Sequence, residues 1–257
     1  MRTGFAALAA VGTLGALLAA APGALAQTVA GSSSAMVENP CALPRNAGND
    51  WAALCKYQAA DKQISGRPRA VFIGDSITEW WLAGSPALFA SGVVNRGIAG
   101  QTSPQMLVRF TQDVVRLRPR VVHIMAGTND LLGNTGPTSA EEYVNTITAM
   151  TDIARANGIA VVIGSVLPTS GAPWKPEYRP AAQIEALNRW LREFAKARGF
   201  GFADYYAAMV GEGGAMKPGL ASDGVHPTPA GYAVMEPIAK AAIAEAEKRG
   251  GGEGARR

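Results

Sequence analysis

The sequence predicts one α/β domain, a three-layer α/β/α sandwich around a five-stranded parallel sheet. Five short apolar runs alternate with stretches whose apolar residues recur at helical spacing, a pattern typical of a parallel sheet with helices on both faces. Polar residues and glycines follow these runs, and no repeat or second domain is visible. A chain of 257 residues is long enough to bury the core of such a fold.

The first 26 residues have the features of a signal peptide. Arg2 gives a basic start, residues 5–21 are apolar, and residues 24–26 fit the small-x-small cleavage pattern. An uncleaved membrane anchor is the alternative. We expect export to the periplasm or the medium, followed by three segments of the mature chain. These are a disordered lead-in, a folded domain and a disordered tail, over residues 27–40, 41–248 and 249–257.

The cysteines and the charge limit the classes of partner. Cys41 and Cys55 are the only cysteines, and in an oxidising compartment such a pair predicts a disulfide. Free thiols or a metal site are alternatives, but two histidines complete no convincing zinc ligand set. Arg2 contributes one of the net +4 charges, which leaves +3 on the rest of the chain. No basic stripe interleaved with aromatic residues is present, so nucleic-acid binding is disfavoured.

The first strand is expected at residues 70–74, and a helix is expected to begin after Gly74-Asp75-Ser76. Before it, residues 50–63 carry apolar residues at helical spacing and predict a helix with Trp51 packed on the domain. Ser76 would lie at the carboxyl end of a parallel strand, where α/β proteins bind ligands, so its hydroxyl is a candidate nucleophile. Alternatively, Ser76 and Glu79 form a capping box and the serine only caps its own helix.

Two further strands are expected to end in polar loops at the same edge of the sheet. A short strand within residues 92–102 leads to Gly100, where a glycine allows a backbone N–H to approach a ligand closely. The strand at residues 120–126 contains His123, which we interpret as a core histidine. Asn129 and Asp130 follow it; the Asn129 amide is an uncharged donor suited to an oxyanion, or both are ordinary turn formers.

The second half of the chain continues the alternation of helices and strands. The expected elements are a helix opened by a capping box at Ser139 and Glu142, a strand, a helix, a short strand and a final helix, over residues 139–154, 159–165, 184–194, 201–204 and 228–248. The connection over residues 167–180 is longer than usual and is a candidate wall of a binding site.

His226 is the candidate general base. It lies in a polar loop three residues after Asp223, so one short turn can bring the carboxylate to the imidazole. An acid that orients the imidazole and stabilises its charged form completes a Ser-His-Asp arrangement. A surface ion pair between the same two residues is the alternative.

Taken together, these sites resemble the SGNH (GDSL-type) hydrolase family. Four segments are similar, in order and spacing, to sequence blocks of that family: residues 74–76 (GDS), 95–101 (NRGIAGQ), 127–130 (GTND) and 223–227 (DGVHP). Ile77 stands where a leucine often follows the serine, a change that conserves volume. The resemblance implies a flavodoxin-like fold and ester hydrolysis, with no metal or organic cofactor required. It assigns the triad to Ser76, Asp223 and His226, and the oxyanion hole to Ser76, Gly100 and Asn129.

The substrate is predicted less sharply. Four aromatic residues near the site are candidate contacts for a sugar face or an acyl chain, or else pack under loops: Trp80, Trp81, Trp174 and Tyr178. Because no amphipathic lid stands out, we expect short acyl esters, such as acetyl groups on an exported polysaccharide, and no stable membrane insertion after processing. A lysophospholipase or thioesterase is the alternative, and a non-catalytic carbohydrate-binding protein of the same fold is a third.

Overall fold

The computed structural model describes residues 39–43 and 50–254. It divides into two compact units, Met1–Pro44 and Arg45–Arg257. In the first unit, the described part contains a short 3-10 helix, η1 (Pro40–Ala42), and the Asn39 side chain accepts a hydrogen bond from the Cys41 N–H. The expected signal peptide and nearly all of the expected lead-in lie outside the described residues. Cys41 and Cys55 are both disulfide-bonded, as expected.

The second unit contains the predicted sheet, in which all pairs of neighbouring strands are parallel. Its five strands are β1 (Ala70–Gly74), β2 (Val93–Gly97), β3 (Val121–Met125), β4 (Ala160–Gly164) and β5 (Gly201–Ala203), in the order β2-β1-β3-β4-β5. Gly74 pairs with Gly97 on one side and with Met125 on the other, so β1, β2 and β3 end level with one another. The chain order reverses between β1 and β3, the place where open α/β sheets bind ligands.

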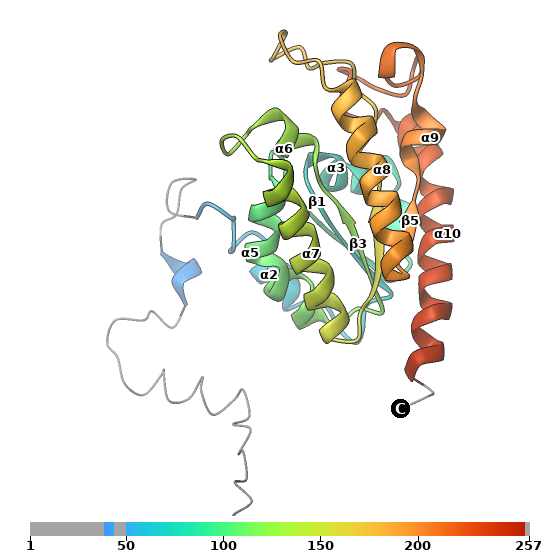
Figure 1. Ribbon diagram of the computed structural model, residues 1–257. Helices are drawn as coiled ribbons and strands as arrows, with labels where there is room; N and C mark the ends of the chain where they lie inside the picture. Colours follow the sequence, from blue (N-terminus) through green and yellow to red (C-terminus); the bar gives the residue numbers. More distant parts are fainter. Residues whose placement is uncertain (1–38, 44–49, 255–257) are drawn as a thin grey trace, which may run out of the picture. The chain divides into compact units, whose positions relative to one another are not determined.

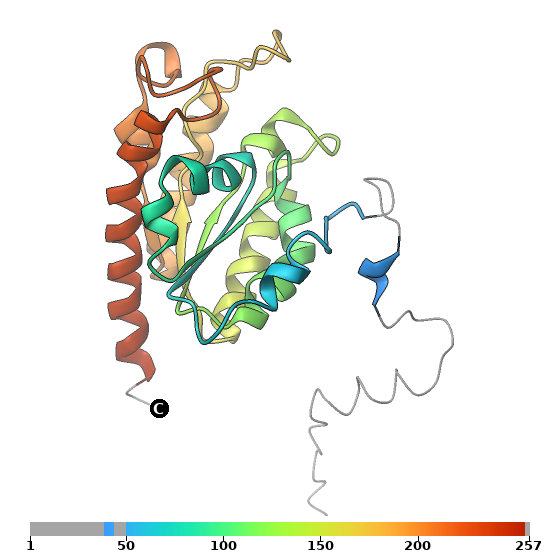
Figure 2. The same cartoon turned by 180° about the vertical axis from the view of Figure 1, so that it is seen from behind.

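Helices cover both faces of the sheet and make the predicted three layers (Figures 1 and 2). One face carries α3 (Ser76–Gly84), α4 (Pro86–Phe89), α9 (Tyr205–Met209) and α10 (Pro229–Gly254). The other carries α5 (Ser103–Asp113), α7 (Ala140–Ala156) and α8 (Ala181–Arg198). Successive strand side chains point to opposite faces, so Phe72 packs against the first group of helices and Ile73 against the second. The fold class is confirmed.

The short elements connect these layers. They are α2 (Gln58–Asp61), η2 (Val115–Leu117), α6 (Thr128–Leu132) and η3 (Glu212–Gly214). The capping box of Ser139 and Glu142 forms at the start of α7, as predicted, with both reciprocal hydrogen bonds present. Local sequence signals therefore determine where this helix begins.

The helix expected over residues 50–63 is wrong for most of that range. Only α2 is α-helical there, and the preceding residues form turns in which the Asp50 carboxylate accepts the Leu54 N–H at 2.8 Å. Ala53 has a left-handed φ of 53°, which a continuous right-handed helix excludes. As a result Ala52 is buried, whereas Trp51, expected to pack on the domain, is 46% exposed.

The last helix is longer than expected. α10 continues to Gly254 rather than ending near Lys248, because glycine weakens a helix without forbidding its backbone angles. Part of the expected tail over residues 249–257 is therefore helical, and residues 255–257 lie outside the described part. No helix among the described residues has both the length and the apolar character needed to cross a membrane.

Close packing of α3 on β2 sets the position of the residues that begin α3. Gly97, the last residue of β2, lies directly against the backbone of α3. A Cβ atom at this position would lie 2.1 Å from the Glu79 backbone nitrogen. Glycine therefore lets the two elements approach, which brings the start of α3 next to the loop that follows β2.

Candidate active site

Ser76 is the first residue of α3 and follows directly on the turn at the end of β1. The N-cap is Asp75, whose Oδ1 accepts the Ile77 N–H at 2.9 Å. Glu79 does not reach back to this turn; its Oε2 accepts the Ala99 N–H at 2.6 Å, and its Oε1 pairs with Lys56. The capping box considered for Ser76 and Glu79 is therefore wrong, and the serine hydroxyl does not cap the helix.

The Ser76 hydroxyl instead contacts His226. The distance from Ser76 Oγ to His226 Nε2 is 2.9 Å, and the distance from His226 Nδ1 to Asp223 Oδ2 is 2.7 Å. With the ionised carboxylate accepting at Nδ1, that nitrogen carries the proton and Nε2 is left to accept from the serine. The three predicted residues thus form one continuous hydrogen-bonded chain.

The loop that carries Asp223 and His226 holds the carboxylate in place. Asp223 Oδ1 accepts the backbone N–H groups of Val225 at 3.0 Å and of His226 at 2.8 Å. Burial by itself raises the pKa of Asp223, but these bonds and the imidazole outweigh it, so the net pKa is below the ordinary value. The carboxylate therefore remains ionised where it faces the imidazole.

Asn129 lies in α6, the short helix after β3, and joins the segments that follow β1 and β2. Its Nδ2 donates to Asp75 Oδ2 and to the Gln101 backbone carbonyl, both at 3.1 Å. Its Oδ1 accepts from Asn134 Nδ2 at 2.7 Å, and that nitrogen also donates to the Gly100 carbonyl at 3.2 Å. The three segments that carry the predicted oxyanion donors are therefore joined at one edge of the sheet.

Two buried carboxyl groups, those of Asp75 and Asp130, lie among the segments joined by Asn129. Burial, reinforced by the nearby Asp130 charge, raises the pKa of Asp75 to about 7. Asp130, which we also considered an ordinary turn former, accepts from the Ser103 hydroxyl at 2.5 Å and from the Ser103 N–H at 3.1 Å. Asp130 thus ties the end of β3 to the start of α5. Burial raises the pKa of this carboxyl too.

Two of the four aromatic candidates flank the imidazole. The ring centroids of Trp80 and Trp174 lie 4.3 Å and 5.8 Å from that of His226. Both indoles are also open to solvent, at 47% and 54% exposed. These two side chains therefore present apolar surface beside the reactive atoms.

The other two aromatic candidates lie elsewhere. Trp81 is fully buried, stacked on Tyr232 with centroids 5.7 Å apart. Successive residues on a helix point about 100° apart, so α3 directs Trp80 outward and Trp81 into the core, and the expectation that Trp81 contacts substrate is wrong. Tyr178 is half-buried against a small cluster formed by Leu132, Ala172 and Val225, which supports the long loop.

An open cavity of about 560 Å³ borders the same loop. Its walls come from the long connection after β4, from Gly213 and from Asp223. The connection supplies Ser170, Gly171, Ala172, Pro173, Pro176 and Arg179, and Ala181, the first residue of α8, also lines the cavity. The predicted binding wall thus lines a hollow next to the acid of the Ser-His-Asp chain.

Sequence reasoning did not single out Gln101, Asn134 or Arg109. Each is held through contacts with residues distant in the chain, such as the bond from Asn134 Nδ2 to the Gly100 carbonyl at 3.2 Å and that from Gln101 Nε2 to the Ala52 carbonyl at 2.8 Å. The one signal was the position of Gln101 directly after Gly100, at a corner between strand and helix.

Comparison with known proteins gives a consistent result. The model of the GDSL-like Lipase/Acylhydrolase family matches residues 72–234. A GDSL-like lipase from Bacteroides thetaiotaomicron is 40% identical over 76% of this chain and 99% of its own, with a TM-score of 0.73. A provisionally assigned acylhydrolase from Bacteroides fragilis is 40% identical over 77% of this chain and 98% of its own, with a TM-score of 0.74.

A more distant structure shares the fold. An acetylxylan esterase from Geobacillus stearothermophilus is 22% identical over 70% of this chain and 94% of its own, with a TM-score of 0.56. No curated protein is significantly similar to the chain.

Proposed function

This chain belongs to the GDSL-like lipase/acylhydrolase family, and we propose that it is an exported serine esterase whose triad is Ser76, His226 and Asp223. The observation that carries the proposal is the continuous hydrogen-bonded chain from Ser76 Oγ through His226 to Asp223. A serine hydroxyl is a weak nucleophile until an adjacent base takes its proton, and this chain supplies the base and the acid that orients it.

In the first half of the reaction, Ser76 Oγ attacks the ester carbonyl carbon while its proton passes to His226 Nε2. The carbonyl electron pair moves onto oxygen, and the resulting oxyanion accepts from the N–H groups of Ser76 and Gly100 and from the Asn129 amide. The intermediate then collapses, the bond to the alcohol breaks, and the leaving oxygen takes the proton from His226. An acyl group remains on Ser76.

In the second half, water replaces the alcohol. His226 accepts a proton from the water, whose oxygen attacks the acyl carbon, and the same donors hold the second oxyanion. Collapse breaks the bond to Ser76 Oγ, which regains its proton from His226 as the acid leaves. Asp223 stabilises the imidazolium in both halves and keeps its own negative charge.

The substrate class that we propose is a short acyl ester, such as an acetyl group on a carbohydrate. Trp80 and Trp174 offer exposed indole faces beside His226, and aromatic faces pack well against sugar rings, which present apolar C–H groups. The fold accommodates such chemistry, since the Geobacillus stearothermophilus enzyme that shares it is an acetylxylan esterase. Because the chain belongs to a family of lipases and acylhydrolases, no observation specifically supports the alternative of a non-catalytic carbohydrate-binding protein.

The test uses residues 27–257, the expected mature chain, with p-nitrophenyl esters from acetate to palmitate and with O-acetylated xylan. We expect rates to fall steeply with chain length, acetate to be released from the xylan, and Ser76→Ala to be inactive and unlabelled by a fluorophosphonate. Preference for long chains with the same serine dependence would favour the lysophospholipase alternative. Full activity of Ser76→Ala would rule out the triad.

A further inference from the structure

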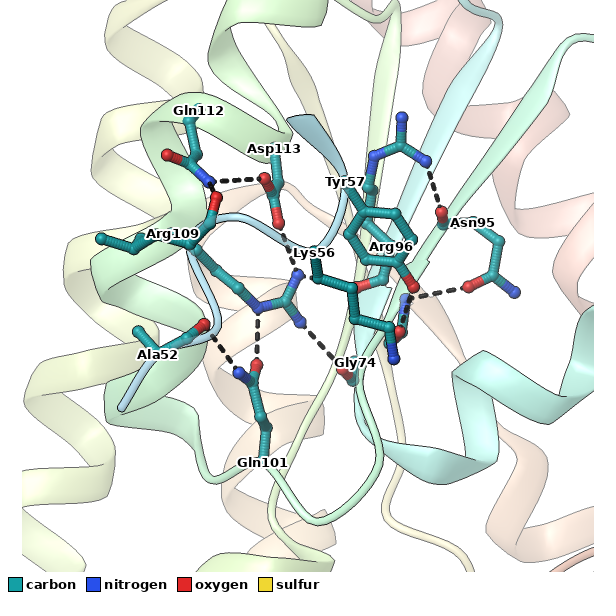
Figure 3. A network of polar contacts seen from close by, with 12 residues as sticks. Ala52, Lys56, Tyr57, Gly74, Asn95, Arg96, Gln101, Arg109, Gln112 and Asp113 are labelled. Atoms are coloured by element: carbon teal, nitrogen blue, oxygen red, sulfur yellow. Dashed lines mark hydrogen bonds and ion pairs between the residues drawn. The ribbon is translucent and has the colours of Figure 1, made fainter. Parts of the chain in front are cut away.

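Arg109 is a buried cation on α5 that has no part in the proposed chemistry. Its side chain is 0% exposed. Its guanidinium donates to Gln101 Oε1 at 2.5 Å, to the Arg96 carbonyl at 2.8 Å, to Asp113 Oδ2 at 2.9 Å and to the Gly74 carbonyl at 3.0 Å (Figure 3). Burying a guanidinium is costly unless its donors are satisfied, and here each of its nitrogens has an acceptor.

The two carbonyls bound by Arg109 belong to neighbouring strands, close to where each ends. Gly74 is the last residue of β1, two positions before Ser76, and Arg96 lies in β2, one position before Gly97. One planar group therefore fixes the separation of the two strand ends. The loops that begin there carry the Ser76 N–H and the Gly100 N–H.

Gln101, another of the acceptors of Arg109, connects Arg109 to Asn129. The Gln101 side chain accepts from Arg109 through Oε1 and donates through Nε2 to the Ala52 carbonyl, so its position is fixed from two sides (Figure 3). The backbone carbonyl of the same residue accepts from Asn129 Nδ2 at 3.1 Å. Gln101 also directly follows Gly100. A single side chain thus links the segments that carry all three proposed oxyanion donors.

We propose that Arg109 is a positioning residue that holds the Ser76 N–H, the Gly100 N–H and the Asn129 amide in register for the oxyanion. The inference rests on the proposed function, since it assigns a support to that oxyanion hole. The effect is geometric and not a matter of charge, because Asp113, only 1% exposed, forms an ion pair with Arg109.

A lysine could not take this role. Its ammonium is a compact group with three donors on a flexible stem, whereas the guanidinium presents five donors in a rigid plane. Arg109→Lys keeps the charge next to Asp113 but loses the fixed spacing between the two carbonyls and Gln101. The substitution therefore separates geometry from charge.

Arg96→Lys is a matched control. Arg96 is also buried, at 4% exposed. Its side chain pairs with Asp61, donates to the Asn95 carbonyl at 2.6 Å and lies over the Tyr57 ring, and within the described part of the chain it makes no hydrogen bond to a proposed oxyanion donor. Both variants replace one buried, paired arginine close to the same strand ends. A loss of activity that follows only from lower stability would appear in both.

The experiment measures kcat and KM for p-nitrophenyl acetate below the unfolding temperature, together with inhibition by a boronic acid that forms a tetrahedral adduct on serine. We expect Arg109→Lys to lower kcat by about ten- to a hundredfold. Boronate affinity should fall in parallel while KM stays nearly constant. Arg96→Lys should keep the wild-type kcat. A double variant of Arg109→Lys with Asn129→Ala should lose less than the product of the single losses.

Retention of the wild-type kcat and boronate affinity by folded Arg109→Lys would overturn the proposal, as would equal losses in both arginine variants. Should Arg109→Lys fail to fold, Gln101→Met leaves Arg109 in place and removes the two side-chain bonds of Gln101, to Arg109 Nε and to the Ala52 carbonyl. The same fall in kcat at constant KM is expected of it, and an unchanged kcat would again overturn the proposal. Ser76→Ala distinguishes a failure of the role proposed for Arg109 from a failure of the proposed triad. If it is inactive while Arg109→Lys is fully active, only the role of Arg109 is wrong, and if it is active, the triad itself is wrong.

Discussion

The Asn129 amide has an acceptor for each of its N–H groups within the protein, namely Asp75 Oδ2 and the Gln101 carbonyl. An oxyanion is a stronger acceptor than a neutral carbonyl, so the developing charge competes best for the N–H directed at Gln101. We expect Asn129→Ala to lower kcat on the order of a hundred- to a thousandfold with little change in KM. Steady-state kinetics with p-nitrophenyl acetate measures this. Activity within a few-fold of wild type would remove Asn129 from the oxyanion hole.

Asp75 predicts a dependence of stability on pH. Burial raises the pKa of Asp75 from 3.8 to about 7, so between these values the native state holds a proton that the unfolded state has released. The free energy of unfolding therefore falls as the pH rises through this range. Asp75→Asn has no such proton, so its free energy of unfolding relative to wild type should rise from pH 4 to pH 8, by at most about 4 kcal/mol.

Urea denaturation of both proteins at several pH values measures the Asp75 effect. Groups common to the two proteins cancel in the difference between them. A difference that stays constant from pH 4 to pH 8 would mean that Asp75 titrates near its ordinary value, in spite of its burial.

At the scale of elements, the contact between β2 and α3 predicts the effect of a single methyl group. A Cβ atom at position 97 would lie 2.1 Å from the Glu79 backbone nitrogen, so Gly97→Ala forces α3 away from the sheet. We expect a loss of about 1–3 kcal/mol in the free energy of unfolding, with reduced activity because Ser76 begins the same helix. Chemical denaturation and the esterase assay measure the two effects.

Gly66→Ala is the control for Gly97→Ala. Gly66 has a φ of +73°, and a Cβ atom there would have nothing within 4 Å, so alanine adds backbone strain without a clash. We expect lower stability but an unchanged kcat. If Gly97→Ala kept as much stability and as high a kcat as Gly66→Ala, α3 would have moved away from the sheet without cost. That result would contradict the close packing of α3 on β2.

The central strands β1, β3 and β4 could be predicted closely because strands buried on both faces appear as nearly continuous apolar runs. The start of α7 was equally readable, since its capping box is local. Residues 50–63 were not, because the apolar spacing of a helix is present while the Asp50 carboxylate and the left-handed Ala53 hold the chain in turns. The roles of Trp80 and Trp81 could not be told apart from the sequence either. Which of the two faces the core depends on how α3 packs on the sheet.

At the scale of the whole molecule, the site lies where the strand order β2-β1-β3-β4-β5 reverses, between the strands that precede Ser76 and Asn129. The residues that we propose for the chemistry could be selected from the sequence, since each follows a strand or sits in a recognisable loop. Their supports could not. Arg109 binds carbonyls of two strands, and nothing in its own segment indicates which strand ends will meet there.

Export is the remaining property of the whole chain that the sequence predicts. Residues 1–26 lie outside the described residues, and export is predicted from their basic start, apolar core and Ala24-Leu25-Ala26 site. Signal peptidase requires small side chains at the first and third of these positions, which explains the expected cleavage after Ala26. Expressed in a bacterium with residues 1–26 included, the enzyme should therefore be recovered from the periplasm or the medium with Gln27 at its N-terminus.

Mass spectrometry of the intact protein and fractionation of the cells test this prediction together. A variant with Ala24→Leu and Ala26→Leu should keep the apolar segment but resist cleavage, and should remain in the membrane fraction with residues 1–26 attached. If the wild-type chain also kept these residues and stayed in the membrane fraction, the segment would be an anchor. The esterase would then act at the membrane surface, on substrates that reach it there.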